Sequence, residues 1–288
     1  MNCIPALIAG VKEIYMTVPS INGQINPGVL YAAKKCKVNK IFKLGGAQAV
    51  AAFAFGTKTI NKVDKIVGPG NEYVALAKKE VSGVSGIDIF AGPSEVTVVA
   101  DKNSNPEWIS ADLIAQSEHD EMSQSILVTD NKNLINKVQY YLKKQLKFLP
   151  KKKIASISLG KFGLAIFVKN AREVSEIVNL IAPEHLQIYT KKPDKYLKSI
   201  DNAGSIFLGA YSPEAVGDYL AGPNHVLPTS GTAKFSSGLS VFDFLKRQSI
   251  IKISKRGIEK LGPSVVTLSK YENLYGHANS VKLRLKER

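Results

Sequence analysis

The chain has 288 residues, of which 44% are hydrophobic and 22% charged, and its 39 Lys and Arg against 24 Asp and Glu give a net charge of +15. This composition excludes a mainly disordered chain, and the length is enough for about two domains of ordinary size. No apolar run reaches the roughly 18 residues of a membrane span, and the first residues lack the basic and apolar regions of a signal peptide.

The first part of the chain alternates strands and helices. Residues 2–9 have the pattern of the last turns of a helix. We expect strands at 11–18, 40–44, 63–67 and 87–90, and helices at 28–36, 47–55 and 72–81. Glycine-rich turns follow three of the strands, at Gly45-Gly46, at Gly68-Pro69-Gly70-Asn71 and at Gly92-Pro93-Ser94-Glu95. Strands that end at glycine and lead into a helix are typical of parallel βαβ units.

Ligands of such sheets bind beyond the carboxyl ends of the strands, so the three glycine-rich turns are candidate ligand sites. None of them matches the Gly-x-Gly-x-x-Gly pattern of dinucleotide-binding loops. Taken singly, each turn is explained as well by the backbone geometry of a tight turn.

A second alternating region begins at Val96. We expect strands at 96–100, 125–128, 163–168, 185–189 and 205–208, and helices at 131–146 and 171–181. Another helix is expected from Asn105-Pro106-Glu107, a good N-cap followed by proline and an acid, to about His119. From about Ile250 the pattern changes to strand and helix fragments rich in Lys and Leu, which end in an extended basic tail. The alternation as a whole predicts the α/β class.

The cysteines and the net charge indicate which cell compartment and which partners to expect. Cys3 and Cys36 form no close pair, which argues against a disulfide framework and a cysteine-based zinc site and favours the cytoplasm. The positive charge comes mainly from scattered lysines, without the arginine clusters and adjacent aromatic residues of nucleic-acid readers. We expect a solvated lysine-rich surface, or one that attracts anions generally, and neither a nucleic-acid nor a membrane partner.

The candidate chemistry gathers around the four histidines. Gln116 and His119 are three residues apart at a helix end, so both side chains can point at one ion, although an ordinary hydrogen-bonded helix end has the same pattern. Glu184 and His185 are adjacent and offer two titratable groups with different ordinary pKa values, which suits proton transfer as well as a polar surface turn.

Two further segments carry polar side chains. Asp218 precedes a loop rich in Gly and Pro that contains His225, and His277 lies near the end of the chain on a helical tail. The set Gln116, His119, Asp218 and His277 offers nitrogen and oxygen ligands that suit zinc or a similar divalent ion. The spacing leaves open whether these four residues converge.

Six ordered motifs together resemble the histidinol dehydrogenase family over essentially the whole chain. They are Gly45-Gly46-Ala47-Gln48-Ala49, Gly68-Pro69-Gly70-Asn71, Gly92-Pro93-Ser94-Glu95-Val96, Gln116-Ser117-Glu118-His119, Pro183-Glu184-His185-Leu186, and Gly217-Asp218-Tyr219 with Asn224-His225-Val226-Leu227-Pro228. The resemblance implies a zinc-dependent oxidation of L-histidinol to L-histidine, the last step of histidine biosynthesis, in two NAD-dependent steps through a bound aldehyde.

The resemblance also implies a role for each matching residue. Zinc is expected on Gln116, His119, Asp218 and His277, where it would hold the imidazole and amine of the substrate. His185 is expected to take the alcohol proton, and Glu184 to activate the water that attacks the aldehyde. The residues expected to touch substrate are Ser94, Gln116, His119, His185, Asp218, His225, Glu272 and His277. Gln48 and Asn71 are expected to contact NAD, and His277 and Glu272 to complete the site of the other subunit in a homodimer.

The family implies two Rossmann-like domains with helices on both faces of parallel sheets. We expect a NAD-binding domain at 1–93, a domain with the zinc and catalytic residues at 94–243, and a small helical C-terminal tail at 244–288 that serves dimerisation and the active site. Members of the family are about half as long again. We therefore expect both domains to lack their N-terminal side, and the polypeptide alone to be unstable or weakly active unless a separate upstream chain complements it. The alternatives are a zinc-binding dimer without catalysis and a relative that oxidises another small alcohol.

Overall fold

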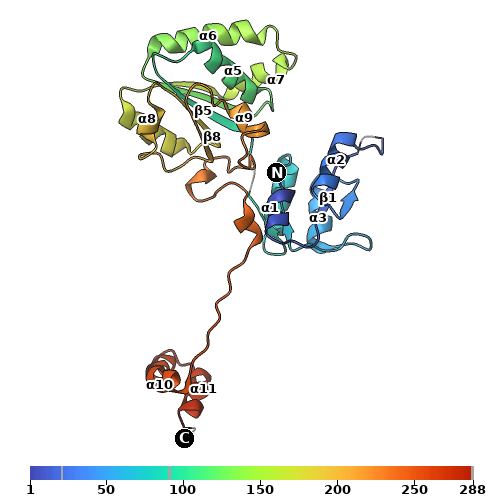
Figure 1. The fold of residues 1–288 in the computed structure, drawn as a ribbon, viewed down its shortest axis with the longest axis vertical. Coiled ribbons are helices and arrows are strands. Elements are labelled where there is room, and N and C mark those ends of the chain that lie inside the picture. Colours follow the sequence, from blue (N-terminus) through green and yellow to red (C-terminus); the bar gives the residue numbers. More distant parts are fainter. Residues whose placement is uncertain (21, 90–91, 287–288) are drawn as a thin grey trace. The chain divides into compact units, whose positions relative to one another are not determined.

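The computed structural model describes residues 1–20, 22–89 and 92–286, which divide into two compact units, Met1–Leu245 and Lys246–Arg288. Figure 1 shows helices and parallel strands in the first unit and helices in the second. The α/β class is confirmed. The division of the first unit at residue 93 stays a prediction.

The first part of unit 1 consists of short βα repeats. In order they are α1 (Cys3–Ile8), β1 (Tyr15–Thr17), α2 (Pro27–Lys35), β2 (Lys40–Phe42), α3 (Ala47–Phe55), β3 (Lys65–Ile66), α4 (Glu72–Val81) and β4 (Gly86–Ile87). Strand β1 pairs with β2 and β3 with β4, both in parallel. The predicted helices are confirmed almost to the residue. The strands are shorter than predicted, and Phe90, the last residue of the strand expected at 87–90, lies outside the described residues.

A small core holds this part together. Val50, Phe53 and Ala54 of α3 are buried against Ile66 of β3 and Val81 of α4. The spacing of three and four residues puts the apolar side chains of α3 on one face of the helix. Gly46 and Gly56 flank this helix with φ angles of +75° and +78°, which other residues rarely adopt.

The second part of unit 1 is a five-stranded parallel sheet. Its elements are β5 (Glu95–Ala100), α5 (Pro106–Ser117), β6 (Gln124–Thr129), α6 (Lys132–Leu146), α7 (Lys152–Phe162), β7 (Gly163–Phe167), α8 (Ala171–Ile181), β8 (His185–Tyr189), β9 (Ser205–Leu208) and α9 (Glu214–Tyr219). The strand order is β7-β6-β5-β8-β9. The sequence did not predict α7 or α9, while α8, β8 and β9 have the predicted bounds.

The sheet has a hydrophobic core on each face. Val98 of β5 packs with Ile109 and Leu113 of α5, whereas its neighbour Val99 packs with Val178 of α8 on the opposite face. Successive side chains of a strand point to opposite faces, so β5 contributes to both cores through its buried valines Val96, Val98 and Val99. The expected covering of both faces by helices is confirmed, and β5 and β8 lie at the centre of the sheet.

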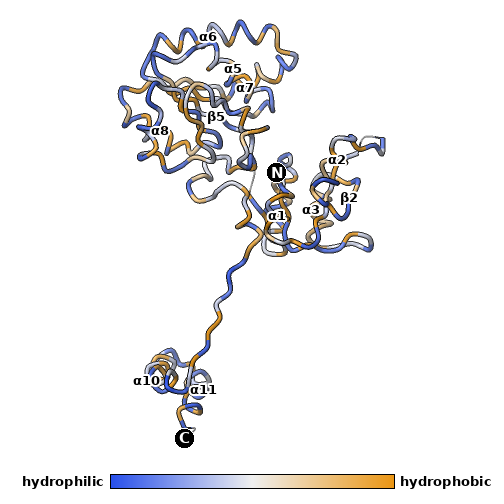
Figure 2. The backbone as a smooth tube through the Cα atoms, in the orientation of Figure 1, coloured by the Kyte–Doolittle hydropathy of each residue, from blue (hydrophilic) through white to orange (hydrophobic). Residues whose placement is uncertain are grey.

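Unit 2 contains two helices, in the region where the sequence predicted a small helical tail with an extended basic end. They are α10 (Lys255–Tyr271) and α11 (Tyr275–Lys286), joined by a turn in which Asn273 has a φ of +60°. A Cβ atom at Gly262 would lie within 2.9 Å of Leu285, so glycine permits the close approach of the two helices. The expected helical tail is confirmed, whereas the end of the chain, expected to be extended, is helical to Lys286, because alternating Lys and Leu obscure the helical period. Figure 2 shows apolar residues among hydrophilic ones in the segment before α10.

Among the helices in the described part of the chain, none combines the length and the apolar character that crossing a membrane requires.

The core against α5 provides a test of the fold. Leu113 is 3% exposed in this core, whereas Leu180 of α8 is 72% exposed. We expect Leu113→Ala to lower the free energy of unfolding by about 2–5 kcal/mol, because it removes buried methyl groups and leaves a cavity. Leu180→Ala, the same change on an exposed helix position, is expected to stay within about 0.5 kcal/mol. Urea unfolding of both variants measures the difference, and equal losses would contradict the arrangement of this core.

Candidate active site

The predicted proton-transfer residues lie at the amino edge of the five-stranded sheet. His185 is the first residue of β8, where it pairs with Val96 of β5 on one side and Ser205 of β9 on the other. Glu184 immediately precedes it. Because parallel strands start at a common edge, this pairing places the adjacent Glu184 and His185 beside Glu95, the first residue of β5.

Glu184 is held by the backbone of both neighbouring strands. Its Oε2 accepts a hydrogen bond from Glu95 N at 2.9 Å, and its carbonyl oxygen accepts one from Ser205 N at 2.9 Å. A Cβ atom at Gly204 would lie 2.5 Å from the carbonyl oxygen of Glu184, so β9 can approach only because glycine stands there. The side chain of Glu184 is buried, with 8% of its surface exposed.

Burial raises the pKa of Glu184 to about 8, because a charged carboxylate is poorly solvated there. The hydrogen bond from Glu95 N acts in the opposite direction, and the negative charges of Glu95, Asp218 and Glu214 add to the increase. The carboxyl group is therefore a stronger base, once ionised, than an exposed glutamate.

His185 is buried and its ring orientation is fixed. Nδ1 lies 2.9 Å from the carbonyl oxygen of Glu95, and this oxygen can only accept, so Nδ1 carries the hydrogen. Nε2 is then the basic nitrogen. It is buried, has no hydrogen-bond partner and lies 3.7 Å from Asp218 Oδ1. Burial lowers the pKa of His185, and the Glu95 carbonyl and Asp218 oppose this decrease.

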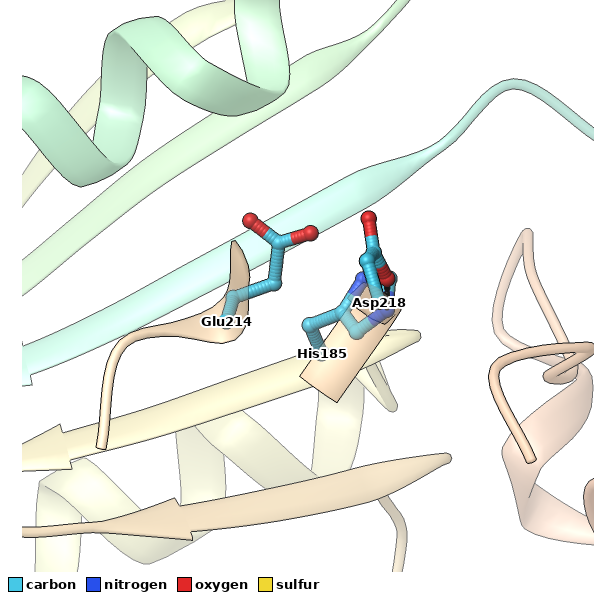
Figure 3. Close-up of side chains that lie close together, drawn as sticks. All are labelled: His185, Glu214 and Asp218. Carbon is cyan, nitrogen blue, oxygen red and sulfur yellow. Dashed lines mark ion pairs between the residues drawn. The ribbon is translucent and has the colours of Figure 1, made fainter. Parts of the chain in front are cut away.

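A third acid, which the sequence analysis missed, joins these residues. Glu214 and Asp218 lie four residues apart on α9, and their carboxyl oxygens and a ring nitrogen of His185 all lie within 4.8 Å of one another. Figure 3 shows the three side chains gathered between β8 and α9. Glu214 is 2% exposed, and burial raises its pKa to about 8, with the charge of Asp218 next in importance. The i, i+4 spacing of the two acids is the sequence signal that would have found it.

Two further polar side chains, those of Gln187 and Asp112, lie next to the site. Gln187, two residues after His185 on the same face of β8, donates a hydrogen bond from Nε2 to Asp112 Oδ2 at 2.7 Å. Burial raises the pKa of Asp112 to about 6, although the hydrogen bond from Gln187 works against the increase. Asp112 lies one turn before Gln116 on α5.

A cavity of about 560 Å³ opens beside the acids, and His185, Asp218 and His225 line it. His225 is half-buried, and its Nδ1 lies 3.0 Å from the backbone carbonyl oxygen of Asp218. The ring of Phe207 on β9 lies 6.1 Å from that of His185 and packs against Gly217 of α9. His185, Asp218 and His225, which span 40 positions of the sequence, thus lie around one cavity.

The remaining predicted residues of this unit lie around the same edge. Gln116 is buried at the end of α5, and neither atom of its side-chain amide has a hydrogen-bond partner. His119 is exposed in the turn after α5, and its charge helps to lower the pKa of His185. Ser94, half-buried, precedes β5, and its carbonyl oxygen accepts a hydrogen bond from Gln124 N at 3.0 Å.

The donor atoms fit a divalent ion such as zinc. Both side-chain amide atoms of Gln116 are buried without partners, and an unsatisfied buried polar group is costly unless something binds it. Together with Asp218 and His119, the Gln116 amide oxygen supplies the mixed nitrogen and oxygen ligands that zinc accepts. The sharing of one metal by these residues stays a prediction.

The predicted NAD contacts are exposed in the first part of unit 1. Gln48 lies in the first turn of α3, and its amide folds back toward Gly46. Asn71 is the N-cap of α4, where its Oδ1 accepts a hydrogen bond from Val74 N at 3.1 Å. Both follow the carboxyl end of a strand, as expected, and their contact with NAD stays a prediction.

The predicted residues from the tail lie in unit 2. Glu272 is the C-cap residue of α10, and His277 lies in the first turn of α11; both are exposed. Their contribution to another subunit's site stays a prediction.

A buried acid and a buried imidazole with opposite pKa shifts, beside a cavity, are typical of α/β enzymes that transfer protons. The comparisons identify the family. A family model described as Histidinol dehydrogenase matches residues 1–285. The chain is 54% identical to the histidinol dehydrogenase of Pelagibacter ubique, with 100% of this chain and 68% of the relative covered, and 54% identical to that of Clostridium acetobutylicum, with 99% and 67% covered.

A solved structure agrees with the relatives. Histidinol dehydrogenase from Elizabethkingia anophelis superimposes with a TM-score of 0.94 at 42% identity, over 99% of this chain and 66% of that one. The chain therefore belongs to the histidinol dehydrogenase family, and it spans about two thirds of the length of these relatives.

The contact between Gly217 and Phe207 provides a test of the site's packing. A Cβ atom at Gly217 would lie 2.5 Å from two ring carbons of Phe207. We expect Gly217→Ala to cost about 1–3 kcal/mol of unfolding free energy and Phe207→Leu in the same chain to recover part of it. Gly160→Ala in α7, where a Cβ meets nothing within 4 Å, is expected to stabilise slightly instead. Urea unfolding of Gly217→Ala, of Phe207→Leu, of the double variant and of Gly160→Ala decides, and additive losses in the cycle would contradict the contact.

Asp112 provides a test of the buried charges. Its folded pKa of about 6 exceeds the ordinary value of 3.8, so the folded chain keeps a proton that the unfolded chain releases. The stability that this proton contributes is complete below about pH 4 and is lost as the pH rises through 6. We expect Asp112→Asn, which cannot ionise, to gain stability relative to the wild type from pH 4 to 7. Urea unfolding with a chelator present measures this, and a difference that does not vary with pH would contradict it.

Proposed function

We propose that this chain oxidises L-histidinol to L-histidine through L-histidinaldehyde in two NAD-dependent steps, as an oxidoreductase of histidine biosynthesis. The observation that carries the proposal is the buried pair Glu184 and His185, two bases of different kinds held at one sheet edge beside a cavity. Membership of the histidinol dehydrogenase family supports the choice of substrate.

His185 suits the removal of the alcohol proton. Its Nδ1–H is bound to the Glu95 carbonyl, so the free Nε2 is available to accept a proton. Burial keeps the imidazole neutral by lowering its pKa, which is the state that a general base requires. In each oxidation the O–H proton of the substrate passes to His185 Nε2, and NAD, when bound, would accept the hydride from the carbon that bears this oxygen.

Glu184 suits the activation of water. Oxidation of an aldehyde to an acid requires its hydration, and the attacking water must lose a proton to a base. Glu184 Oε2 is fixed by Glu95 N, and its raised pKa makes the carboxylate a strong acceptor for that proton. His185 thus serves the step in which the hydride leaves, and Glu184 serves the hydration of the aldehyde.

Zinc and NAD complete the proposal. Gln116, His119 and Asp218, with His277 of a second subunit, would hold the zinc, and zinc when bound would fix the imidazole and amine of the substrate. Ser94, His225 and Glu272 of a second subunit would contact the substrate as well. Gln48 and Asn71 would hold NAD, which accepts the hydride. We place the homodimer in the cytoplasm, in keeping with the two free cysteines.

The stoichiometry of NADH tests the division of roles. We expect the wild type with zinc to form two NADH per L-histidinol. His185→Asn removes the base of both oxidations and should lower kcat by about 10²–10⁴-fold. Glu184→Gln should form one NADH per substrate and accumulate the aldehyde, since it impairs only hydration.

Glu107→Gln, on the exposed first turn of α5, serves as the matched control and should behave as the wild type. Absence of NADH from the wild-type chain would refute the proposed activity for this polypeptide. Two NADH per substrate from Glu184→Gln at an undiminished rate would refute the role of Glu184 alone.

A further inference from the structure

Glu214 has no task in the chemistry proposed above, although it is the most deeply buried acid at the site. It begins α9, its side chain is 2% exposed, and its Oε1 has no hydrogen-bond partner. The acids in the first turns of α4 and α5, Glu72 and Glu107, are exposed to solvent. An acid that only stabilises the helix dipole needs no burial, so the position of Glu214 calls for another explanation.

The surroundings of Glu214 point to a cation. Asp218 lies one helical turn further along the same face of α9, and like charges at this spacing repel each other. A ring nitrogen of His185 lies within 4.8 Å of both carboxyl groups, although we assign it to proton transfer rather than to the ion. A buried carboxyl group and a partly buried one at this distance are stabilised by a positive ion close to them.

Gln116 supplies a second and independent observation. As a metal ligand it must use Oε1, because its amide nitrogen has no free electron pair, and Nε2 then still needs an acceptor. Neither atom has a partner in the structure. Helices α5 and α9, which carry Gln116 and Glu214, are in contact. Glu214 Oε1 is a buried acceptor without a donor in the same region.

We infer that Glu214 is a positioning residue of the metal site, which holds Asp218 and the amide of Gln116 so that both present an oxygen to the ion. This inference rests on the proposed function, since it assumes a metal on Asp218 and Gln116. Groups that orient metal ligands in this way typically account for about 10–100-fold in metal affinity.

Binding of Co²⁺ to the full chain tests the inference. The variants are Glu214→Gln, which keeps the shape of the side chain, and Glu214→Leu, which removes all polar atoms. Affinity is measured by competition with a chromophoric chelator, and the visible absorption of bound Co²⁺ reports the arrangement of its ligands. Glu107→Gln is the matched control, because it makes the same change in the first turn of an exposed helix.

We expect both Glu214 variants to bind Co²⁺ about 10–100-fold more weakly, with an altered spectrum at saturation, while Glu107→Gln matches the wild type. We also expect the metal-free variants to unfold at a temperature no lower than the wild type, because a buried acid has been removed. A merely structural role for Glu214 predicts the reverse, with lower stability and an unchanged spectrum.

Two results would overturn the inference in distinguishable ways. If the wild type binds Co²⁺ and both Glu214 variants bind it with equal affinity and the same spectrum, Glu214 does not position the ligands, and the proposed function is unaffected. If the wild type binds no Co²⁺, the zinc site of the proposed function fails, and the inference fails with it.

Discussion

The parallel pairing of β5 with β8 is the interaction on which the site depends. It sets Val96 opposite His185, and it thereby brings Glu95 next to the two bases. The backbone N–H of Glu95 binds the Glu184 carboxylate and its carbonyl binds the His185 ring. Both strands are buried on both faces, between α5 and α8, so the register cannot slip without moving apolar side chains out of two cores. The packing of the apolar strands thereby fixes the positions of Glu184 and His185 at the polar edge of the sheet.

The elements with strong local signals could be predicted from the sequence. The bounds of α3, α4 and α8 could be predicted from asparagine caps, glycines at helix ends and helical spacing. Strands β5 and β6 could be predicted from their continuous apolar runs. Helix α7 was missed because its lysines, Lys152 and Lys153, hide the buried stripe of Ala155 and Ser158. In unit 2 the helices α10 and α11 are stabilised by packing against each other, and a local pattern does not contain that information.

Most residues of the site could be predicted from the sequence, but their arrangement in space could not. Motifs identified His185, Asp218 and His225, which share one cavity in the structure. The rule that ligands bind at the carboxyl ends of parallel strands does not describe this edge, because His185 and Glu95 begin their strands. Glu214 was overlooked because α9 itself was not predicted, and without the helix the spacing of four residues to Asp218 carries no meaning. Burial and the pKa values that follow from it depend on tertiary packing alone.

The tautomer of His185 and the orientation of Glu184 are governed by main-chain atoms of Glu95 rather than by a side chain. Every residue type that keeps the strand in place supplies the same main-chain N–H and C=O groups at position 95. The side chain of Glu95 has a different contact, since its Oε1 accepts a hydrogen bond from Ser230 N. Substitutions at position 95 can therefore alter the loop at Ser230 while they leave the support of both bases intact. The charge of the Glu95 side chain adds to the raised pKa of Glu184, so a neutral residue at this position would change the basicity of Glu184 while its orientation stays the same.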